Sequence, residues 1–287
     1  MSLIAELSDI RFTRPDAVAD ALARRVPAPS TITEPLLVVA ADHPARGALA
    51  AGGDDLAMAS REDLLTRCCT ALSRPGVNGF LGTPDMVEDL ALLGALDGKV
   101  VFGSMNRAGV RGSSFEVDDR MTAFDAAGIV DAGLNGGKLL LRIDAQDPAT
   151  SAMLERVSRA VNELTAARRT VLIEPFISRR EGGVLVNDLS PEAVMLSMAV
   201  ASGLGRTSAR TWLKVPCVAD MERVMRATSL PCLLLGGEVS NDHDAAVSHW
   251  AAALTIPNVK GLVIGRALLF PRGGDVAAAV DQLVEVL

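Results

Sequence analysis

Residues 211–216 read Thr211-Trp212-Leu213-Lys214-Val215-Pro216, a run with the length and apolar character of a β-strand but with a lysine inside it. Strands of parallel sheets are buried on both faces and are normally continuous hydrophobic runs. A buried ammonium is costly unless it is paired or deprotonated, and desolvation lowers the pKa of a lysine and exposes a nucleophilic lone pair. We interpret Lys214 either as a residue for amine chemistry or as a strand-end lysine whose ammonium reaches water.

The run around Lys214 is one of eight short apolar runs that alternate with alanine-rich helical patterns. The predicted strands are Leu36–Ala41, Val77–Leu81, Val100–Ser104, Lys138–Ile143, Val171–Pro175, Thr211–Val215, Cys232–Leu235 and Gly261–Ile264. The clearest helical patterns are Arg61–Leu72, Pro84–Leu93, Ala149–Ala167, Pro191–Ser202 and Asp220–Ala227. Eight β-then-α units predict an α/β fold, a single (β/α)8 TIM barrel spanning residues 1–287. We expect an extra N-terminal helix before Leu36 to close the bottom of the barrel.

Composition narrows the range of functions. The 287 residues are 49% hydrophobic, with a net charge of −7 and no basic stripe, so we expect no nucleic-acid partner. No apolar run reaches the ~20 residues of a membrane span, and no signal peptide precedes the first helix, so we expect a cytoplasmic protein without a membrane partner. The four cysteines have no C-x-x-C spacing and are interpreted as reduced thiols. We also expect a homo-oligomer.

Charged residues lie in or next to several predicted strands. Catalytic groups of a TIM barrel sit near the carboxyl ends of its strands. Asp42 follows the first strand, Glu174 lies in the fifth and Lys214 in the sixth. Lys138 opens the fourth strand, which is the wrong end for catalysis, so either that strand begins earlier or Lys138 is structural. Each of the two acids also has a plain interpretation, a salt bridge for Glu174 and a turn or cap for Asp42.

Two glycine motifs follow the last two strands. Gly236-Gly237 comes directly after the seventh strand, with Ser240 and Asn241 following, and Gly265-Arg266 comes after the eighth. Backbone amides in such turns, together with an arginine, suit a phosphate group, and TIM barrels commonly bind phosphate after these two strands. A Gly-Gly pair alone is usually only a turn.

The order of these motifs resembles that of class I, Schiff-base aldolases of the tagatose-bisphosphate type, within the deoxyribose-phosphate aldolase-like superfamily. The matching residues are Asp42 with Arg46-Gly47-Ala48-Leu49, Lys138 with Asp144, Glu174, Leu213-Lys214-Val215, Gly236-Gly237 and Gly265-Arg266. His43-Pro44 is an insertion relative to that pattern, and the run from Ser178 to Gly183 also departs from it. The loop Phe115–Arg120 is similar to an actinobacterial branch linked to inositol catabolism.

The resemblance implies a lyase that cleaves a ketose phosphate through a lysine imine to dihydroxyacetone phosphate and an aldehyde. Its small-molecule partner would be a phosphorylated sugar, either tagatose or fructose bisphosphate or 5-dehydro-2-deoxygluconate 6-phosphate. Lys214 would form the imine, Lys138 would lower its pKa, Glu174 would transfer protons and Asp42 would hold hydroxyls or assist cleavage. No cofactor is implied. The chain's three histidines, His43, His243 and His249, are not spaced as a metal cluster, so no metal is expected.

The far end of such a substrate carries a second anion, for which we expect an arginine. The arginines that follow suitable strands are Arg46, Arg107, Arg111 and Arg179. Each is alternatively a solvated loop residue. Two other functions stay open from the sequence: a phosphate-binding barrel isomerase that uses carboxylates without an imine, and a non-catalytic barrel that binds sugar phosphates. Borohydride reduction separates them, because only an imine is trapped.

Overall fold

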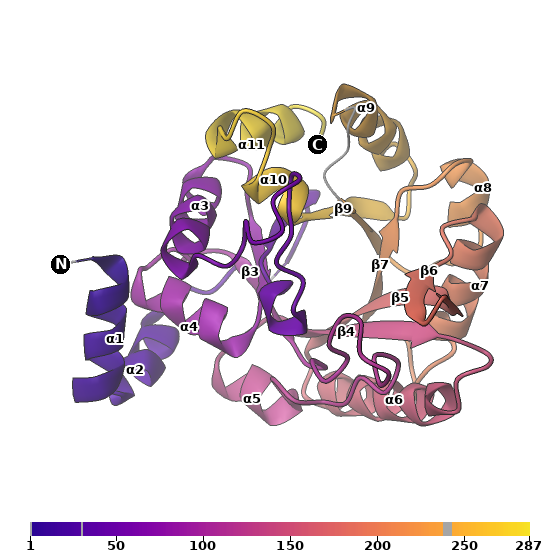
Figure 1. The fold of residues 1–287 in the computed structure, drawn as a ribbon, viewed down its shortest axis with the longest axis horizontal. Coiled ribbons are helices and arrows are strands. Elements are labelled where there is room, and N and C mark those ends of the chain that lie inside the picture. Colours follow the sequence, from indigo (N-terminus) through magenta and orange to yellow (C-terminus); the bar gives the residue numbers. More distant parts are fainter. Residues whose placement is uncertain (1, 30, 238–242) are drawn as a thin grey trace.

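In the computed structural model, which describes residues 2–29, 31–237 and 243–287, eight parallel strands form a closed barrel (Figure 1). The sheet order is β4-β3-β2-β1-β9-β8-β7-β5, and pairing of β4 with β5 closes it. The barrel strands are β1 (Leu36–Ala40), β2 (Gly79–Gly82), β3 (Val100–Ser104), β4 (Gly136–Ile143), β5 (Thr170–Glu181), β7 (Thr211–Pro216), β8 (Cys232–Leu235) and β9 (Val259–Ile264). The predicted TIM barrel is confirmed.

Helices surround the barrel and cover its outer face (Figure 1). They are α3 (Arg61–Ser73), α4 (Pro84–Leu92), α5 (Ala126–Asp131), α6 (Ala149–Ala166), α7 (Pro191–Ser202), α8 (Met221–Met225), α9 (His243–Leu254), α10 (Arg266–Leu269) and α11 (Val276–Val284). Serine side chains cap two of them: Ser60 accepts a hydrogen bond from the Asp63 amide and Ser190 accepts one from the Ala193 amide, both at 3.3 Å. Each cap satisfies a backbone donor that the first helical turn leaves unpaired.

Successive residues of a strand point alternately to two apolar cores, one between the barrel and the helices and one inside the barrel. In β1, Leu37 and Val39 point outward and pack against the helices, whereas Leu36, Val38 and Ala40 belong to a smaller cluster inside the barrel. This follows from the two-residue period of a strand, which sends successive side chains to opposite faces. The inner cluster fills only part of the barrel, and the residues nearer the carboxyl ends of the strands are charged.

The bottom of the barrel is closed differently from the prediction. Two N-terminal helices, α1 (Leu3–Thr13) and α2 (Asp16–Arg24), lie outside the helical ring next to α4 (Figure 1). The segment after α2 contacts the inner cluster through Ala28, together with Trp212. Arg25 holds this segment by donating to the Lys99 and Gly133 carbonyls at 3.1 and 2.6 Å. The expected helical plug is therefore wrong.

Several strand boundaries also differ from the expected ones, and two of the differences, in β4 and β5, affect the site. β4 begins at Gly136, so Lys138 is its third residue and pairs with Ser104, the last residue of β3. β5 continues to Glu181 and forms an antiparallel hairpin with β6 (Val184–Asn187), where a loop was expected. A strand of this length extends past the barrel rim and forms one wall of the opening.

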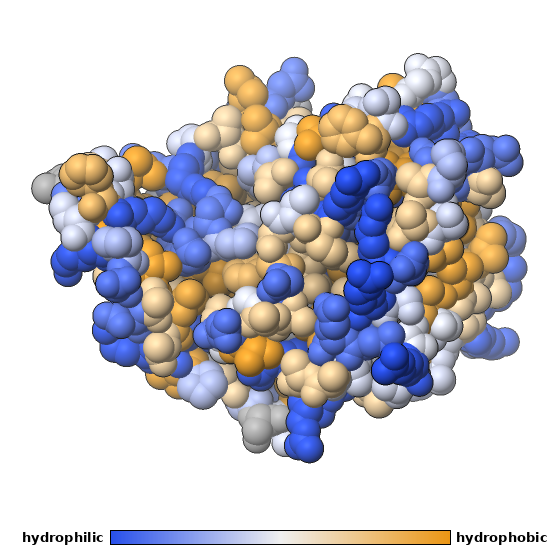
Figure 2. Space-filling view, turned by 90° about the horizontal axis from the view of Figure 1, so that it is seen from below, coloured by the Kyte–Doolittle hydropathy of each residue, from blue (hydrophilic) through white to orange (hydrophobic). Residues whose placement is uncertain are grey.

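Polar and apolar residues are mixed over the face of the molecule drawn in Figure 2. None of the helices among the described residues is both long and apolar enough to cross a membrane. The four cysteines are free, and Cys68 and Cys232 are buried.

Candidate active site

Three barrel strands bring charged residues to the interior through the same alternation that builds the core. In β4, Lys138 and Arg142 share the inward face with Leu140 between them. In β5, Glu174 lies two residues beyond the inner-core residue Leu172, and in β7, Lys214 lies two residues beyond Trp212. The apolar lower half of the barrel is therefore topped by a charged layer at the carboxyl ends of the strands.

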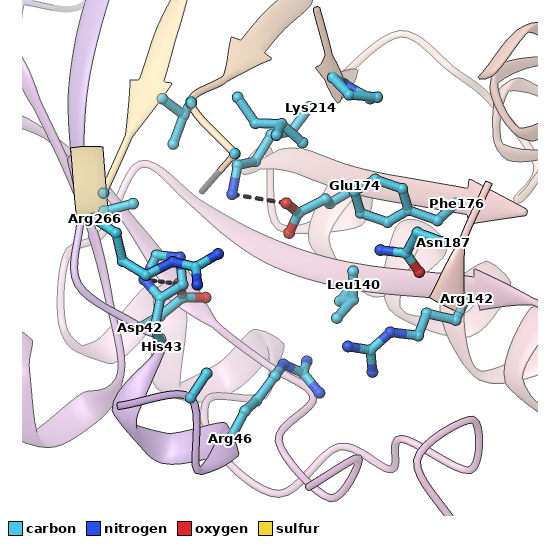
Figure 3. Close-up of a pocket in the computed structure, with 18 of the residues that line it drawn as sticks. Asp42, His43, Arg46, Leu140, Arg142, Glu174, Phe176, Asn187, Lys214 and Arg266 are labelled. Carbon is cyan, nitrogen blue, oxygen red and sulfur yellow. Dashed lines mark ion pairs between the residues drawn. The ribbon is translucent and has the colours of Figure 1, made fainter. Parts of the chain in front are cut away.

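Glu174 bridges the two lysines of this layer. Its Oε1 lies 2.9 Å from Nζ of Lys214 (Figure 3). Its Oε2 lies 2.6 Å from Nζ of Lys138. All three residues are at most 8% exposed. Of the two interpretations of Lys214, the structure favours the buried, paired amine over a side chain that reaches water.

Asp42, at the end of β1, joins the same network. Its Oδ2 lies 3.2 Å from Nζ of Lys138 and accepts a hydrogen bond from Ser104 Oγ at 2.8 Å. Arg107 pairs with the same carboxylate and donates to the Asp42 carbonyl at 2.7 Å. Asp42 is thus held by groups from β3, β4 and the loop after β3.

Burial and pairing shift the pKa values of these groups in opposite directions. Burial lowers the pKa of Lys138 to about 8, although Asp42 and Glu174 favour its ammonium. Burial raises the pKa of Glu174, but the two neighbouring lysines outweigh this and lower it from the usual 4.5. Burial likewise opposes the ionised form of Asp42, yet Arg107 and Lys138 hold its pKa well below 3.8. Both carboxylates are therefore ionised at neutral pH.

A cavity of about 700 Å³ opens above the charged layer. Among the described residues, its floor and walls include every site residue predicted from the sequence except Arg179. The predicted residues that line it are Asp42, Arg46, Arg107, Arg111, Lys138, Glu174, Lys214, Gly236, Gly237, Gly265 and Arg266. The β5–β6 hairpin contributes Val184, Leu185, Val186 and Asn187 on one side. The strand ends thus converge on a space that is large enough for a sugar phosphate.

The predicted phosphate residues lie on neighbouring strands. β8 and β9 pair directly, so Gly236 and Gly265 lie side by side at the same rim of the barrel. Gly237 has a φ of +65°, which suits glycine, and is exposed. Arg266 reaches the cavity next to Asp42 and His43 (Figure 3). Ser240 and Asn241, which were expected to complete this site, lie outside the described residues.

The four arginines predicted for a distal anion occupy different environments. Arg46 is buried, pairs with Asp119 and donates to the Asn106 carbonyl at 2.7 Å. Arg107 is bound to Asp42, and Arg111 lies exposed at the cavity rim. Arg179 lies on the hairpin, paired with Glu181 and Asp188. Only Arg46, Arg107 and Arg111 are within the cavity wall.

The sequence did not predict several polar residues that line the cavity, among them Arg142 and Asn187. Arg142 pairs with Glu116 at 3.0 Å, and its other terminal nitrogen is buried without a hydrogen-bond partner among the described residues. Burial and, after it, the nearby Arg46 guanidinium lower the pKa of Arg142, and both side chains are drawn in Figure 3. The signal was available, because Arg142 follows Lys138 by four residues and so shares its face of the strand. Asn187 depended on the hairpin, which was not expected.

No group of three or more histidine, cysteine, aspartate or glutamate residues in the described part of the chain is arranged to hold a metal ion. The described side chains that line the cavity supply amines, carboxylates, guanidinium groups, imidazoles and a thiol.

The sequence model of the Cgl0159-like family matches residues 34–284, which includes the whole barrel and every residue of the site described above. The chain belongs to the Cgl0159-like family. The crystal structure of Cgl0159 from Corynebacterium glutamicum is 49% identical to the chain, with a TM-score of 0.96 over 99% of this chain and 96% of that one. A search of curated proteins found no match.

Other solved structures with this fold are less similar to the chain. A Schiff-base-forming fructose-1,6-bisphosphate aldolase is 17% identical, with a TM-score of 0.65 over 94% of this chain and 99% of that one. An archaeal fructose-1,6-bisphosphate aldolase is 16% identical, with a TM-score of 0.66 over 94% and 98%. At these identities the likeness establishes a shared TIM-barrel fold. The tagatose-type resemblance and the inositol branch stay predictions.

Proposed function

We propose that this protein is a class I aldolase that cleaves a ketose phosphate through an imine on Lys214. The observation that carries the proposal is the position of Lys214, buried inside the barrel with its Nζ 2.9 Å from Glu174 and facing a cavity of about 700 Å³. A barrel lysine at the end of its strand is the arrangement that imine chemistry needs. The distant fold relatives that are aldolases support this assignment.

Each residue of the charged layer has a role in this reaction. Lys214 attacks the ketose carbonyl, and the resulting carbinolamine loses water to give an iminium that accepts the electrons of the C–C bond. Glu174 contacts the amine directly and transfers protons as the carbinolamine forms and collapses. Lys138, whose pKa burial lowers to about 8, and Asp42 hold the substrate hydroxyls at the cleaved bond.

The two ends of the substrate are bound on opposite sides of the cavity. The phosphate of the imine half binds at Gly236, Gly237, Gly265 and Arg266, where β8 and β9 end. The second anion binds near Arg46 and Arg142, whose guanidinium groups approach each other on the β1 and β4 side. The second anion can be a phosphate or a carboxylate, so the bisphosphates and 5-dehydro-2-deoxygluconate 6-phosphate all remain candidate substrates.

Reduction with borohydride in the presence of dihydroxyacetone phosphate tests the proposal. Peptide mass spectrometry should find the reduced adduct on Lys214, and the Lys214→Arg variant should form no adduct, because a guanidinium stays protonated. Turnover of a ketose phosphate should be lost in the same variant. An adduct on Lys138, or none on any lysine, would overturn the assignment and leave the isomerase and the non-catalytic sugar-phosphate binder as the alternatives.

A further inference from the structure

His43 is a cavity residue to which the aldolase reaction assigns no role so far. It follows Asp42 at the end of β1, where its carbonyl accepts the Arg46 and Ala48 amides at 3.0 and 3.3 Å and so fixes the turn η1 (Pro44–Arg46). The imidazole side chain is 22% exposed and lines the cavity. Gly265 leaves room for it, since a Cβ at that position would lie 2.5 Å from Cε1 of His43. The ring is therefore held at a defined place.

The two oxygens of the Asp42 carboxylate have different surroundings. The side-chain contacts from Ser104, Arg107 and Lys138 all fall on Oδ2. Oδ1 lies 3.9 Å from Nδ1 of His43, and that nitrogen is buried with no hydrogen-bond partner among the described residues. A carboxylate next to Nδ1 favours the tautomer with its proton on that nitrogen, which leaves Nε2 as a free base.

The imidazole of His43 is neutral, as a base must be before it accepts a proton. Burial lowers the pKa of His43 to about 3, and Arg266, Lys214 and Lys138 add to the effect against the opposing influence of Asp42. The imidazole is therefore neutral at neutral pH. A substrate phosphate at Arg266 would offset that positive charge and make the imidazolium easier to form once the substrate is bound.

We propose that His43, oriented by Asp42, transfers the proton at the carbon next to the imine. This inference rests on the proposed aldolase function and extends it. In the cleavage direction, Nε2 takes the proton from the substrate hydroxyl, the C–C bond breaks, and its electron pair forms the enamine on Lys214. The imidazolium then returns that proton to the enamine carbon, which restores the neutral histidine and gives the iminium of dihydroxyacetone phosphate. One proton moves from oxygen to carbon, and no oxidant or further reactant is needed.

The composition and the ion pairs favour His43 over other groups for this step. The chain has no tyrosine, so no phenol can do it. Glu174 already contacts both lysines and serves the carbinolamine steps, and Asp42 uses one oxygen for three cationic or hydroxyl partners. Cys217 also lines the cavity, but burial raises the pKa of its thiol to about 11.

The test separates imine formation from proton transfer. Wild-type protein is incubated with dihydroxyacetone phosphate in D2O, and loss of the hydroxymethyl proton signal is followed by NMR. In parallel, borohydride traps the adduct on Lys214. The His43→Gln variant should keep the adduct, whereas exchange should fall by ~100-fold or more, as expected for loss of a positioned general acid–base. Added imidazole should restore part of the exchange in His43→Ala, an effect that a purely structural role would not produce.

A matched control removes the other described imidazole at the cavity. His249 is exposed on α9, and His249→Ala should exchange at the wild-type rate. If wild type forms no adduct on Lys214, the aldolase proposal itself fails. If the adduct forms but His43→Gln exchanges normally, or wild type shows no exchange, only the role of His43 is overturned. Loss of adduct and exchange together in both His43 variants would also overturn it, because His43 would then serve binding or folding.

Discussion

The carboxylate of Glu174 lies 2.9 Å from the amine of Lys214 inside the barrel, where both side chains are almost fully shielded from water. A buried ion pair of this kind contributes little net stability, because desolvation of the two charges offsets their attraction. Replacing only one of the two charged side chains leaves the other charge buried and uncompensated, which typically costs about 3–5 kcal/mol. We therefore infer that the pair serves catalysis rather than the stability of the fold.

The pH dependence of the reaction should reflect Lys138. Because burial lowers the pKa of Lys138 to about 8, its ammonium is present below that pH and is lost above it. We expect kcat/KM to fall as pH rises through about 8, and the falling limb to move to higher pH in Lys138→Arg, whose side chain stays protonated. Initial-rate profiles between pH 6 and 10 measure this. If the falling limb of the pH profile is unchanged in Lys138→Arg, ionisation of another group causes it.

Acid should destabilise the fold through Asp42 and Glu174. Their pKa values are lowered from 3.8 and 4.5 in the folded chain, so their contribution to the free energy of unfolding is complete above about pH 4.5 and is lost as pH falls below it. Each unit of difference corresponds to about 1.4 kcal/mol. The decline of Tm between pH 5 and 3 should be shallower in Glu174→Gln than in wild type.

The matched control for that measurement is Glu222→Gln. Glu222 is an exposed carboxylate on α8 that pairs with Arg226 one helical turn away. Exposed pairs of this type contribute little to stability, so this variant should follow the wild-type decline of Tm. Equal slopes for all three proteins would show that the buried carboxylates do not govern acid unfolding.

The distal anion should depend on Arg142. One of its buried nitrogens has no hydrogen-bond partner among the described residues, and Arg46 lies nearby, so we expect Arg142 to contact the second anion. Arg142→Ala should weaken kcat/KM for a doubly anionic ketose by about 1.5–3 kcal/mol, the usual value of a hydrogen bond to a charged group, and should scarcely affect a substrate without that anion.

Arg179→Ala is the control for that prediction, because Arg179 lies outside the cavity and pairs with Glu181 and Asp188. Alanine variants at Arg46, Arg107 and Arg111 complete the comparison. A selective loss in Arg179→Ala with none in Arg142→Ala would place the anion on the hairpin instead.

Activity should survive removal of metal ions. In the proposed reaction the iminium on Lys214 accepts the electrons of the broken bond, so no Lewis acid is needed for that step. Turnover measured after exhaustive dialysis against EDTA should match that of untreated protein. A loss that zinc restores, while an EDTA-treated sample still unfolds at the same temperature, would contradict the imine mechanism.

Much of the site could be predicted from the sequence because a TIM barrel relates position in a strand to position in space. The expectation that strand ends converge placed Lys214, Glu174 and Asp42 together, as did the resemblance to class I aldolases, and the structure brings all three to one cavity. The sequence left open whether Lys138 is a site residue or a structural one, because the start of β4 was predicted two residues late. Strand ends are not marked sharply by local preference, so such errors are common.

The sequence by itself determined the fold class, since eight apolar runs of strand length separated by helical patterns have few other arrangements. It also determined which residue types could react. Tertiary structure decided how they pair. Closure of the barrel between β4 and β5 brings Lys138 within 2.6 Å of Glu174, and the β5–β6 hairpin adds Asn187 to the cavity. The position of His43 next to Gly265 is decided in the same way. These contacts join residues distant in the chain, so they depend on closure and packing of the whole barrel rather than on any local pattern.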